Sequence, residues 1–193
     1  MELSCRLVKT EEDIERVIEF RYKFLCVWNN FCEIKKSKTE SISDKFDRCS
    51  KFILCENSDG CVVGVVRLII PDDDNLFMDQ FIDRKGYINL SIKDNRFIEL
   101  CEFITHKDFR NNYKIIYHLI LYCSNYILHN NYEEAASIST KSVHRLLSRL
   151  GFQKCPVSFI SEWGGEMTLH TLKIRDVNKS NLINLSKRFN VTL

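Results

Sequence analysis

Three charged residues lie in segments whose other side chains are mostly apolar. Arg21 falls within a helical stripe of apolar residues, Arg67 within CVVGVVRLII and Glu99 within FIELCEFIT. A charged group in such a segment needs a partner or a hydrated cavity, because the burial of an isolated charge is costly. Arg21 could instead extend from the edge of its stripe into water. The three residues therefore predict a polar pocket inside an apolar shell.

Two more carboxylates, Asp44 and Asp47, lie in the segment SDKFD, ahead of the strand that carries Arg67. Together, the arginines and carboxylates could form a structural ion-pair network or a substrate site. Two aspartates in a polar loop are usually part of a solvated turn. The residue types alone therefore favour a structural network.

The segment HKDFRNNY, residues 106–113, joins an expected strand to an expected helix and is rich in polar and basic groups. A junction of this kind often binds a phosphate, because the first N–H groups of a helix point away from it unpaired. The sequence has no glycine between Gly86 and Gly151, however, so this junction lacks the glycines of most phosphate loops. An ordinary helix start is the alternative interpretation.

Other catalytic and metal-binding motifs are absent from the sequence. There is no GxGxxG, GxxxxGK[ST], GxSxG or HExxH pattern, which disfavours Rossmann and P-loop functions. The nine cysteines form no CxxC pair and the five histidines have no ligand spacing, so no metal site is expected. A catalytic Cys–His pair stays open, because such partners can be distant in sequence.

Composition and charge are those of an ordinary globular chain. Apolar residues make up 45% of the sequence, and the net charge of +2 does not indicate a nucleic-acid partner or an anionic membrane surface. No window approaches a membrane span, and the first residues lack the apolar run of a signal peptide. We therefore expect a cytoplasmic protein whose cysteines are free and mostly buried, without disulfide bonds.

The elements that position these residues follow from the hydrophobic periodicity. Strands are expected at residues 4–9, 50–55, 61–70, 97–105 and 133–140, and a hairpin with a Gly-Gly turn at 157–174. Helices are expected from Thr10, after residue 113, at 140–152 and, with a weak pattern, at 180–189. The connections are a polar loop at 33–49 and a turn with a short helix at 71–82.

The order of these elements indicates the fold class. A central strand at 97–105 is followed by a helix and then by another strand, which predicts an α/β protein with a mixed sheet. The length of 193 residues, without internal repeats or linkers, predicts one domain.

This order resembles the GNAT acyltransferase fold. SVHRLLSRLGFQK is similar to the fourth GNAT helix, which commonly ends in LGF. Arg110 to Ile115 stand where these enzymes read [RQ]xxGx[GA]; the arginine matches, and both small residues are missing. Leu147 stands in place of the tyrosine that many of them use as a general acid. The resemblance implies a single α/β (α+β) GNAT-like domain over 1–193, with a central mixed twisted sheet flanked by helices.

Within that domain, the resemblance implies an acceptor-side half at 1–70, an acyl-donor half at 97–155 and a C-terminal hairpin and tail at 156–193. The missing glycines point to a subgroup, the acyl-homoserine lactone (autoinducer) synthases of quorum sensing. These carry an arginine and a tryptophan on the first helix, then ExDxFD, a strand ending in RL, and a strand in which a glutamate precedes SRF. The matching segments here are SDKFD, GVVRLI and ELCEF, with Arg21 and Trp28 on the first helix.

Two departures from this subgroup concern the acceptor. Glu102 stands where the subgroup has an arginine, and Trp28 is closer to Arg21 than usual. The related N-acyl amino acid synthases share DxFD and the RL strand without using S-adenosylmethionine, and this chain resembles them as well. A strand of period two would place Glu102 on the opposite face from Glu99 unless a bulge intervenes.

The resemblance implies attack of an amine on an acyl thioester. Glu99 would be the base, with a pKa raised by burial, and N–H groups from Cys101 to Ile104 would bind the thioester oxygen. The implied catalytic set is Glu99, Arg67 and Asp47. The implied acceptor-binding set is Arg21, Trp28, Asp44, Phe46 and Phe103. The implied donor-binding set is Cys101, Glu102, Ile104, Arg110, Asn111 and Asn112.

No tightly bound cofactor is implied. The donor would be an acyl-carrier-protein or CoA thioester, and the acceptor a small amine such as S-adenosylmethionine. A basic rim of His106, Lys107, Arg110 and Lys114 could meet an acidic carrier protein. Bulky Tyr113 and Ile115 in place of glycines favour the carrier protein over CoA. The alternatives are an N-acetyltransferase that uses acetyl-CoA and a non-catalytic binding module of the same fold.

Overall fold

The structure, a computed structural model, describes residues 2–72, 75–84, 96–161 and 165–191. Its described residues form one mixed seven-stranded sheet in the order β1-β2-β3-β4-β5-β7-β6. The strands are β1 (Leu3–Leu7), β2 (Ser50–Asn57), β3 (Val62–Ile69), β4 (Phe97–Thr105), β5 (Glu134–Thr140), β6 (Gln153–Ser161) and β7 (Gly165–Lys173). The expected mixed sheet of an α/β domain is confirmed.

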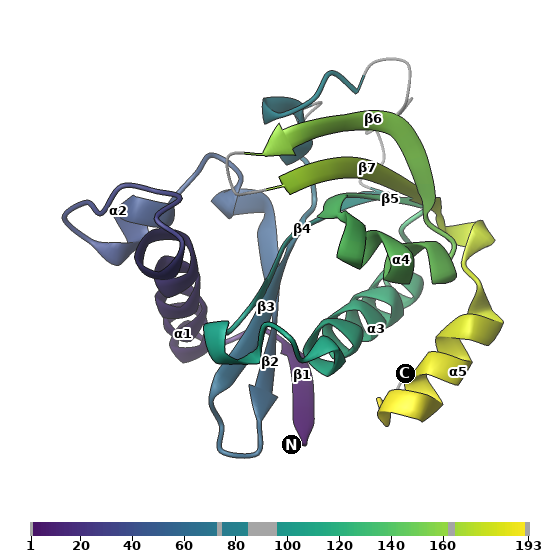
Figure 1. The fold of residues 1–193 in the computed structure, drawn as a ribbon, viewed down its shortest axis with the longest axis horizontal. Helices are drawn as coiled ribbons and strands as arrows, with labels where there is room; N and C mark the ends of the chain where they lie inside the picture. Colours follow the sequence, from purple (N-terminus) through teal and green to yellow (C-terminus); the bar gives the residue numbers. More distant parts are fainter. Residues whose placement is uncertain (1, 73–74, 85–95, 162–164, 192–193) are drawn as a thin grey trace.

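Helices cover both faces of this sheet (Figure 1). They are α1 (Glu11–Tyr22), continued by the π-helix η1 (Lys23–Trp28), α2 (Lys38–Ile42), α3 (Tyr113–His129), α4 (Lys141–Arg149) and α5 (Lys179–Phe189). Short 3₁₀ turns are η2 (Asp47–Cys49), η3 (Phe77–Gln80), η5 (Lys107–Phe109) and η6 (Ile174–Asp176). The main apolar core lies between the sheet and α3, α4 and α5, and a smaller core lies under α1.

Two helix ends are defined by their cap residues, and the expected helix start at Thr10 is confirmed. Thr10 caps α1, and its side chain accepts a hydrogen bond from the backbone N–H of Asp13. Gly151 follows the C-cap of α4 and has a φ of 107°, a conformation that favours glycine. The expected polar loop at 33–49 is wrong in part, because it contains the helix α2. The Ser37 side chain caps this helix by accepting a hydrogen bond from the N–H of Glu40.

Two expected turns fall partly beyond the described residues. Residues 73–74 of the expected turn at 71–82 lie outside them, and so do residues 162–164 of the hairpin turn. The flanking strands β6 and β7 pair in antiparallel register from Gln153 with Thr171 to Ser161 with Gly165, as the sequence predicts.

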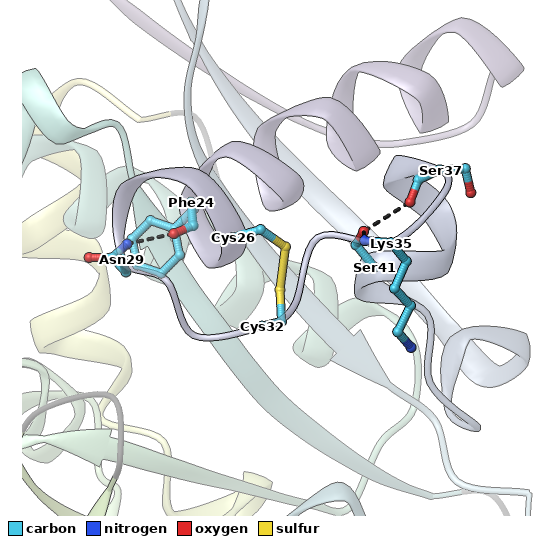
Figure 2. The surroundings of a disulfide bond; sticks show 7 residues. All are labelled: Phe24, Cys26, Asn29, Cys32, Lys35, Ser37 and Ser41. Atoms are coloured by element: carbon cyan, nitrogen blue, oxygen red, sulfur yellow. Dashed lines mark hydrogen bonds between the residues drawn. A yellow bond between two sulfur atoms is a disulfide. The ribbon is translucent and has the colours of Figure 1, made fainter.

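The expectation that all cysteines are free is wrong. Cys26 and Cys32 form a disulfide at the end of η1, with their Cα atoms 5.0 Å apart (Figure 2). The chain turns back after Trp28, and the N–H of Phe31 donates to the carbonyl of Leu25, which brings the two cysteines together. Sequence spacing does not reveal this turn. The other seven cysteines are free, and four of them are buried: Cys55, Cys101, Cys123 and Cys155.

The sheet is divided at one place. β4 and β5 are parallel and pair only from Phe97 with Glu134 to Leu100 with Ser137. Both strands continue beyond that point, to Thr105 and Thr140, without further pairing between them in the described ladder. The sheet therefore has a fork between β4 and β5, and residues on both arms face the space inside it.

A β-bulge lies on the β4 arm of this fork. Ile104 pairs with Val65 and Cys101 with Arg67, so Glu102 and Phe103 together stand opposite one residue of β3. Glu102 has a φ of 50°, in the left-handed region. The bulge turns the side chain of Glu102 toward Arg67, onto the face that carries Glu99, which a strand of strict period two would not do.

Candidate active site

Arg67 is the centre of a buried charged network. Its side chain is fully buried on β3, and all five of its N–H groups are used. Nη1 and Nη2 donate to the two carboxylate oxygens of Asp44 over 2.6 and 2.7 Å, and the remaining bonds go to Asp47, Glu102 and Ser50. Burial alone would lower the pKa of Arg67, but hydrogen bonds with Asp44 and the nearby Glu102 raise it above its usual range.

Arg21 shares this network from α1. It is 3% exposed, so the alternative in which it extends into water is wrong. Its Nε and Nη2 atoms donate to the two oxygens of Glu102 over 2.7 and 2.9 Å, a bidentate pair. Its guanidinium lies 5.0 Å from the ring centroid of Phe52. Glu102 thus bridges two arginines that come from different elements.

The carboxylates outnumber the arginines in this network. Asp44, Asp47 and Glu102 give a formal charge of −3, against +2 from Arg21 and Arg67. Burial raises the pKa of Glu102, but the two arginines lower it more, so that it falls below its usual value. The pKa of Asp44 is also lowered, by Arg67 against the opposing effect of burial. The network therefore holds one surplus negative charge at neutral pH.

The SDKFD motif places its two aspartates by a tight turn. The N–H of Asp44 donates to the side chain of Asp47, and the N–H of Phe46 donates to the side chain of Asp44. Phe46 packs into an apolar cluster with Ile69, Phe77 and Cys101. The aspartates are therefore part of the arginine network, and their side chains are also 28% and 37% exposed.

Glu99 is held apart from the arginines. It is 1% exposed, and its two oxygens accept hydrogen bonds from the N–H groups of Phe77 and Met78, both at 2.8 Å. Burial raises its pKa to about 8, although these two hydrogen bonds oppose the shift. The carboxyl group therefore holds η3 against β4 through these two hydrogen bonds. Because its pKa is raised to about 8, it is mostly protonated at neutral pH.

A cavity of about 360 Å³ lies in the fork between β4 and β5. From β4 it is lined by Glu102, Phe103, Ile104 and Thr105, and from β5 by Ile138, Ser139 and Thr140. Phe24, Leu25 and Phe31, around the π-helix and its disulfide, close the side toward α1. A π-helix often marks a functional site, and this one borders the cavity. The predicted residues Glu102, Phe103, Ile104 and Arg110 are thus brought together.

A second and larger hollow, the basic groove, lies between the start of α3, α4 and the end of α5, with a volume of about 770 Å³. Its basic lining residues are Arg110, Lys114, Arg145, Arg149 and Arg188, and its described lining includes no acidic residue. Phe103, Thr105, Thr140 and Val143 line both the groove and the fork cavity, so the two adjoin each other. Asn111 and Asn112 also lie in the groove, as the donor-site hypothesis requires.

The sequence interpretation missed three of these basic residues. Arg145 and Arg149 are four residues apart on α4, a spacing that places them on one helix face, and this signal was available in the sequence. Arg188 comes from the terminal helix, and only the packing of α5 against α3 brings it to the groove.

Other predicted residues lie elsewhere. The expected rim is divided: of its residues, Arg110 and Lys114 line the basic groove, whereas His106 packs against Trp28 with ring centroids 4.7 Å apart. Trp28 lies in the apolar cluster under α1 and lines a separate hollow along that helix. Arg110 donates one hydrogen bond to the side chain of Asn29, which ties the groove to the end of η1.

The two bulky residues at the start of α3 do not both face the groove, contrary to the expectation from the sequence. Ile115 is fully buried and packs toward Gly64 of β3, so it does not face the groove. Tyr113 lines the groove but is 67% exposed. Only Tyr113 could therefore keep a phosphate away from the backbone. The preference for a carrier protein over CoA then depends on Tyr113 alone and no longer on Ile115.

The architecture of a forked sheet beside a basic groove agrees with the family comparison. The family model described as "Acetyltransferase (GNAT) domain" matches residues 20–119, from the end of α1 to the middle of α3. The chain belongs to the GNAT acetyltransferase family. This GNAT protein is accordingly an acyltransferase. No curated protein matches its sequence.

Solved structures similar to this GNAT protein include acyl-homoserine lactone synthases and an N-acyl amino acid synthase. A CoA-dependent acyl-homoserine lactone synthase, BjaI, with SAM and isopentyl-CoA, has a TM-score of 0.75 at 15% identity, covering 100% of this chain and 92% of that one. Another, MesI, has a TM-score of 0.73 at 13% identity, covering 98% and 97%. FeeM, an N-acyl amino acid synthase from uncultured soil microbes, has a TM-score of 0.60 at 12% identity, covering 91% and 92%.

These similarities establish the shared fold of the GNAT protein and these synthases over nearly their whole lengths. Within the part of the GNAT chain that the structure describes, no helix is both long enough and apolar enough to cross a membrane.

Proposed function

We propose that this protein transfers an acyl group from a thioester donor to the amine of a small acceptor, as an acyl-homoserine lactone synthase does. The observation that carries the proposal is the fork cavity. It opens on one side to the basic groove and is lined on the other by Glu102 of the charged network. A thioester that lies in the fork would meet an acceptor bound at the network.

The donor side favours a CoA thioester. A diphosphate and a further phosphate would find five basic side chains and the start of α3 in the groove. The groove is larger than one phosphodiester of a carrier-protein arm requires. An acyl-carrier-protein thioester remains the alternative donor, because acidic side chains of a carrier protein could also pair with these arginines.

The acceptor side favours a positively charged amine. Arg67 has no N–H group left for an acceptor carboxylate, since its five bonds all go to protein groups. The surplus carboxylate charge suits an acceptor that carries an ammonium and a second cation. S-Adenosylmethionine, with its sulfonium, has this charge pattern, whereas an amino acid without a basic side chain does not. The glutamate at position 102, in place of the arginine of the synthases, is the basis of this preference.

One assay tests the function. The purified protein is given acetyl-, hexanoyl- and decanoyl-CoA and the matching carrier-protein thioesters, with S-adenosylmethionine or single amino acids. Free thiol and acylated product are measured. Release of thiol that depends on the acceptor would support the proposal, and turnover with acetyl-CoA alone would favour an N-acetyltransferase. No thiol release with any pair would sink both and leave a binding module.

The donor groove has its own prediction. Arg149→Glu should raise the KM for an acyl-CoA about tenfold, because one charge-assisted contact with a phosphate is lost and a repulsion is added. Arg175→Glu is the matched control, since Arg175 is exposed on η6 and does not line the groove. Initial rates against acyl-CoA concentration measure the effect. Equal KM values for the two variants would show that the groove does not bind the donor.

Glu99 is the proposed base, acting on the acceptor amine through a water. With a pKa of about 8, it is protonated at lower pH and becomes a base as the pH rises through that value. We expect kcat to rise with pH up to about 8 and then level off. Glu99→Gln should lower kcat about 100-fold and abolish this rise.

The matched control for Glu99 is Asp79→Asn. Asp79 lies on the same 3₁₀ turn that Glu99 anchors and also accepts a hydrogen bond from a backbone N–H, that of Leu76. Asp79→Asn is, like Glu99→Gln, a change from an acid to an amide of the same size. This variant should keep the rise of kcat with pH, but the rise should move to lower pH, because the nearby Asp79 carboxylate is one of the groups that raise the pKa of Glu99. A Glu99→Gln enzyme with an unchanged rate and profile would exclude Glu99 as the base.

A further inference from the structure

A chain of hydrogen-bonded side chains borders the fork cavity on the side of α4. Ser139 on β5 lies with its Oγ atom 3.2 Å from Nδ1 of His170 on β7. Nε2 of His170 lies 2.6 Å from Nδ1 of His144 on α4. Ser139 and His170 are 3% and 0% exposed, whereas His144 is half-buried. The chain therefore runs from the interior toward the surface.

The sheet and α4 hold these three residues in line. In the antiparallel ladder between β5 and β7, Ser137 pairs with His170 and Ser139 with Thr168, so the residues share one face. Helix α4 follows β5 directly and brings His144 back over β7, with the two imidazole centroids 4.7 Å apart. A buried serine and a buried histidine joined to a second, half-buried histidine are more than core packing requires.

One end of this chain reaches the place where the thioester is proposed to lie. Ser139 lines the fork cavity, beyond the last pair of the ladder between β4 and β5. It stands on β5 with its side chain toward α4, on the face where the basic groove enters the fork. A donor that enters from the groove would therefore place its leaving sulfur near Ser139, and its carbonyl carbon would face the charged network.

The proposed reaction needs a proton at that sulfur. Attack of the amine on the carbonyl carbon forms the C–N bond, and the C–S bond breaks to release a thiolate. Leu147, at the position that the GNAT resemblance assigns to a general-acid tyrosine, is apolar and fully buried. Glu102 is bound by two arginines and its lowered pKa leaves it without a proton to give.

We propose that Ser139, His170 and His144 form a relay that delivers this proton to the leaving thiolate, an inference that rests on the proposed function. The Ser139 hydroxyl donates its proton to the sulfur, and its oxygen takes the Nδ1 proton of His170. His170 then takes at Nε2 the Nδ1 proton of His144, and His144 takes a proton at Nε2 from water. The hydroxide that is left is neutralised by the proton that the amine loses when the C–N bond forms. No imidazole becomes charged, and no oxidant or further reactant is needed.

The environment of His170 agrees with a neutral relay. Burial and the neighbouring His144 lower the pKa of His170 to about 4, so its ring stays neutral at physiological pH. A neutral imidazole has one donor and one acceptor nitrogen, which is what a relay requires. Ser137, one pleat back on the same face of β5, has a buried hydroxyl with no partner among the described residues. It offers a matched serine outside the relay.

The test compares leaving groups of different acidity. The variants are Ser139→Ala, His170→Asn and His144→Gln, with Ser137→Ala as the control. Each is given two short donors with the same acyl group, an alkyl thioester related to pantetheine and an aryl thioester whose more acidic thiol leaves without a proton. We expect Ser139→Ala to lose about 100-fold in kcat with the alkyl thioester and less than threefold with the aryl thioester. Ser137→Ala should keep both rates.

The outcomes separate the relay from simpler roles and from the proposed function. An equal loss with both donors would show that Ser139 only shapes the cavity, and an acyl-serine adduct by mass spectrometry would make it a nucleophile. Either result would overturn the relay. His144→Gln, at a half-buried position, repeats the test if His170→Asn does not fold. If the original protein releases no thiol, the proposed function fails, whereas full activity of Ser139→Ala removes the relay alone.

Discussion

Glu102→Gln should lower the free energy of unfolding by about 3–5 kcal/mol at pH 7, because it removes the carboxylate that pairs two buried guanidinium groups. Glu102 is the partner of Arg21 through two hydrogen bonds and of Arg67 through one, and its side chain is 5% exposed. An amide could accept a hydrogen bond from one arginine, but it would leave both positive charges less compensated. Urea unfolding followed by circular dichroism measures the difference.

The loss should depend on pH in a defined direction. The folded pKa of Glu102 lies below its unfolded value, so the stabilisation is complete above the unfolded value of about 4.3 and declines as the pH falls through the folded value. The gap between Glu102→Gln and the original protein should therefore narrow in acid. Glu19→Gln is the control, a partly exposed carboxylate paired with Lys23 and Lys38, with an expected cost of about 0–1 kcal/mol. A gap that stays constant down to pH 3 would contradict this account.

Val143→Trp should lower kcat/KM for acyl-CoA donors by about 100-fold or more while the protein stays folded. Val143 is half-buried on α4 and lines both the basic groove and the fork cavity, so an indole there would obstruct the passage between them. A displaced thioester loses its alignment with the acceptor amine, and misplacement of about 1 Å can cost about 100-fold in rate. Thiol release under subsaturating donor is the measurement.

Two further variants control the size change. Val143→Ala widens the passage and should keep most of the activity or extend it to bulkier acyl groups. Ile160→Trp adds an indole at a position on β6 that is 78% exposed and lines neither the fork cavity nor the basic groove, and it should not change the rate. If Val143→Trp turned over acyl-CoA at the original rate, the donor would have to reach the reaction centre by another route.

Much of the charged network was predictable because its charged residues lie in otherwise apolar segments of the sequence. Arg21, Arg67 and Glu99 interrupt apolar patterns, and the structure buries all three. Which charges pair was not predictable, because the bulge at Glu102 depends on the register between β3 and β4. The strand pattern alone would have kept Glu102 away from the arginines. The charged residues of the site could therefore be identified from the sequence, whereas the register between β3 and β4 determines which of them share a face.

Features that depend on packing between distant segments were not predictable. Arg188 reaches the basic groove only because α5 packs against α3. The disulfide between Cys26 and Cys32 depends on a turn that no residue type specifies. His170 and His144 are 26 residues apart and have no ligand spacing, and only the return of α4 over β7 brings their rings together. These residues can be identified in the sequence, but their proximity in the fold cannot be predicted from it.

The short ladder between β4 and β5 also bears on how the molecule assembles. Strands β2 and β3 form a hairpin, and so do β6 and β7, so part of each antiparallel group, β1 to β4 and β5 to β7, can form from contacts that are close in sequence. The parallel junction joins residues more than thirty positions apart through only four pairs, from Phe97 with Glu134 to Leu100 with Ser137. Parallel pairings of this kind form late in folding. The reaction centre would thus come into existence only when the two groups dock, so that a partly folded chain would bind neither substrate.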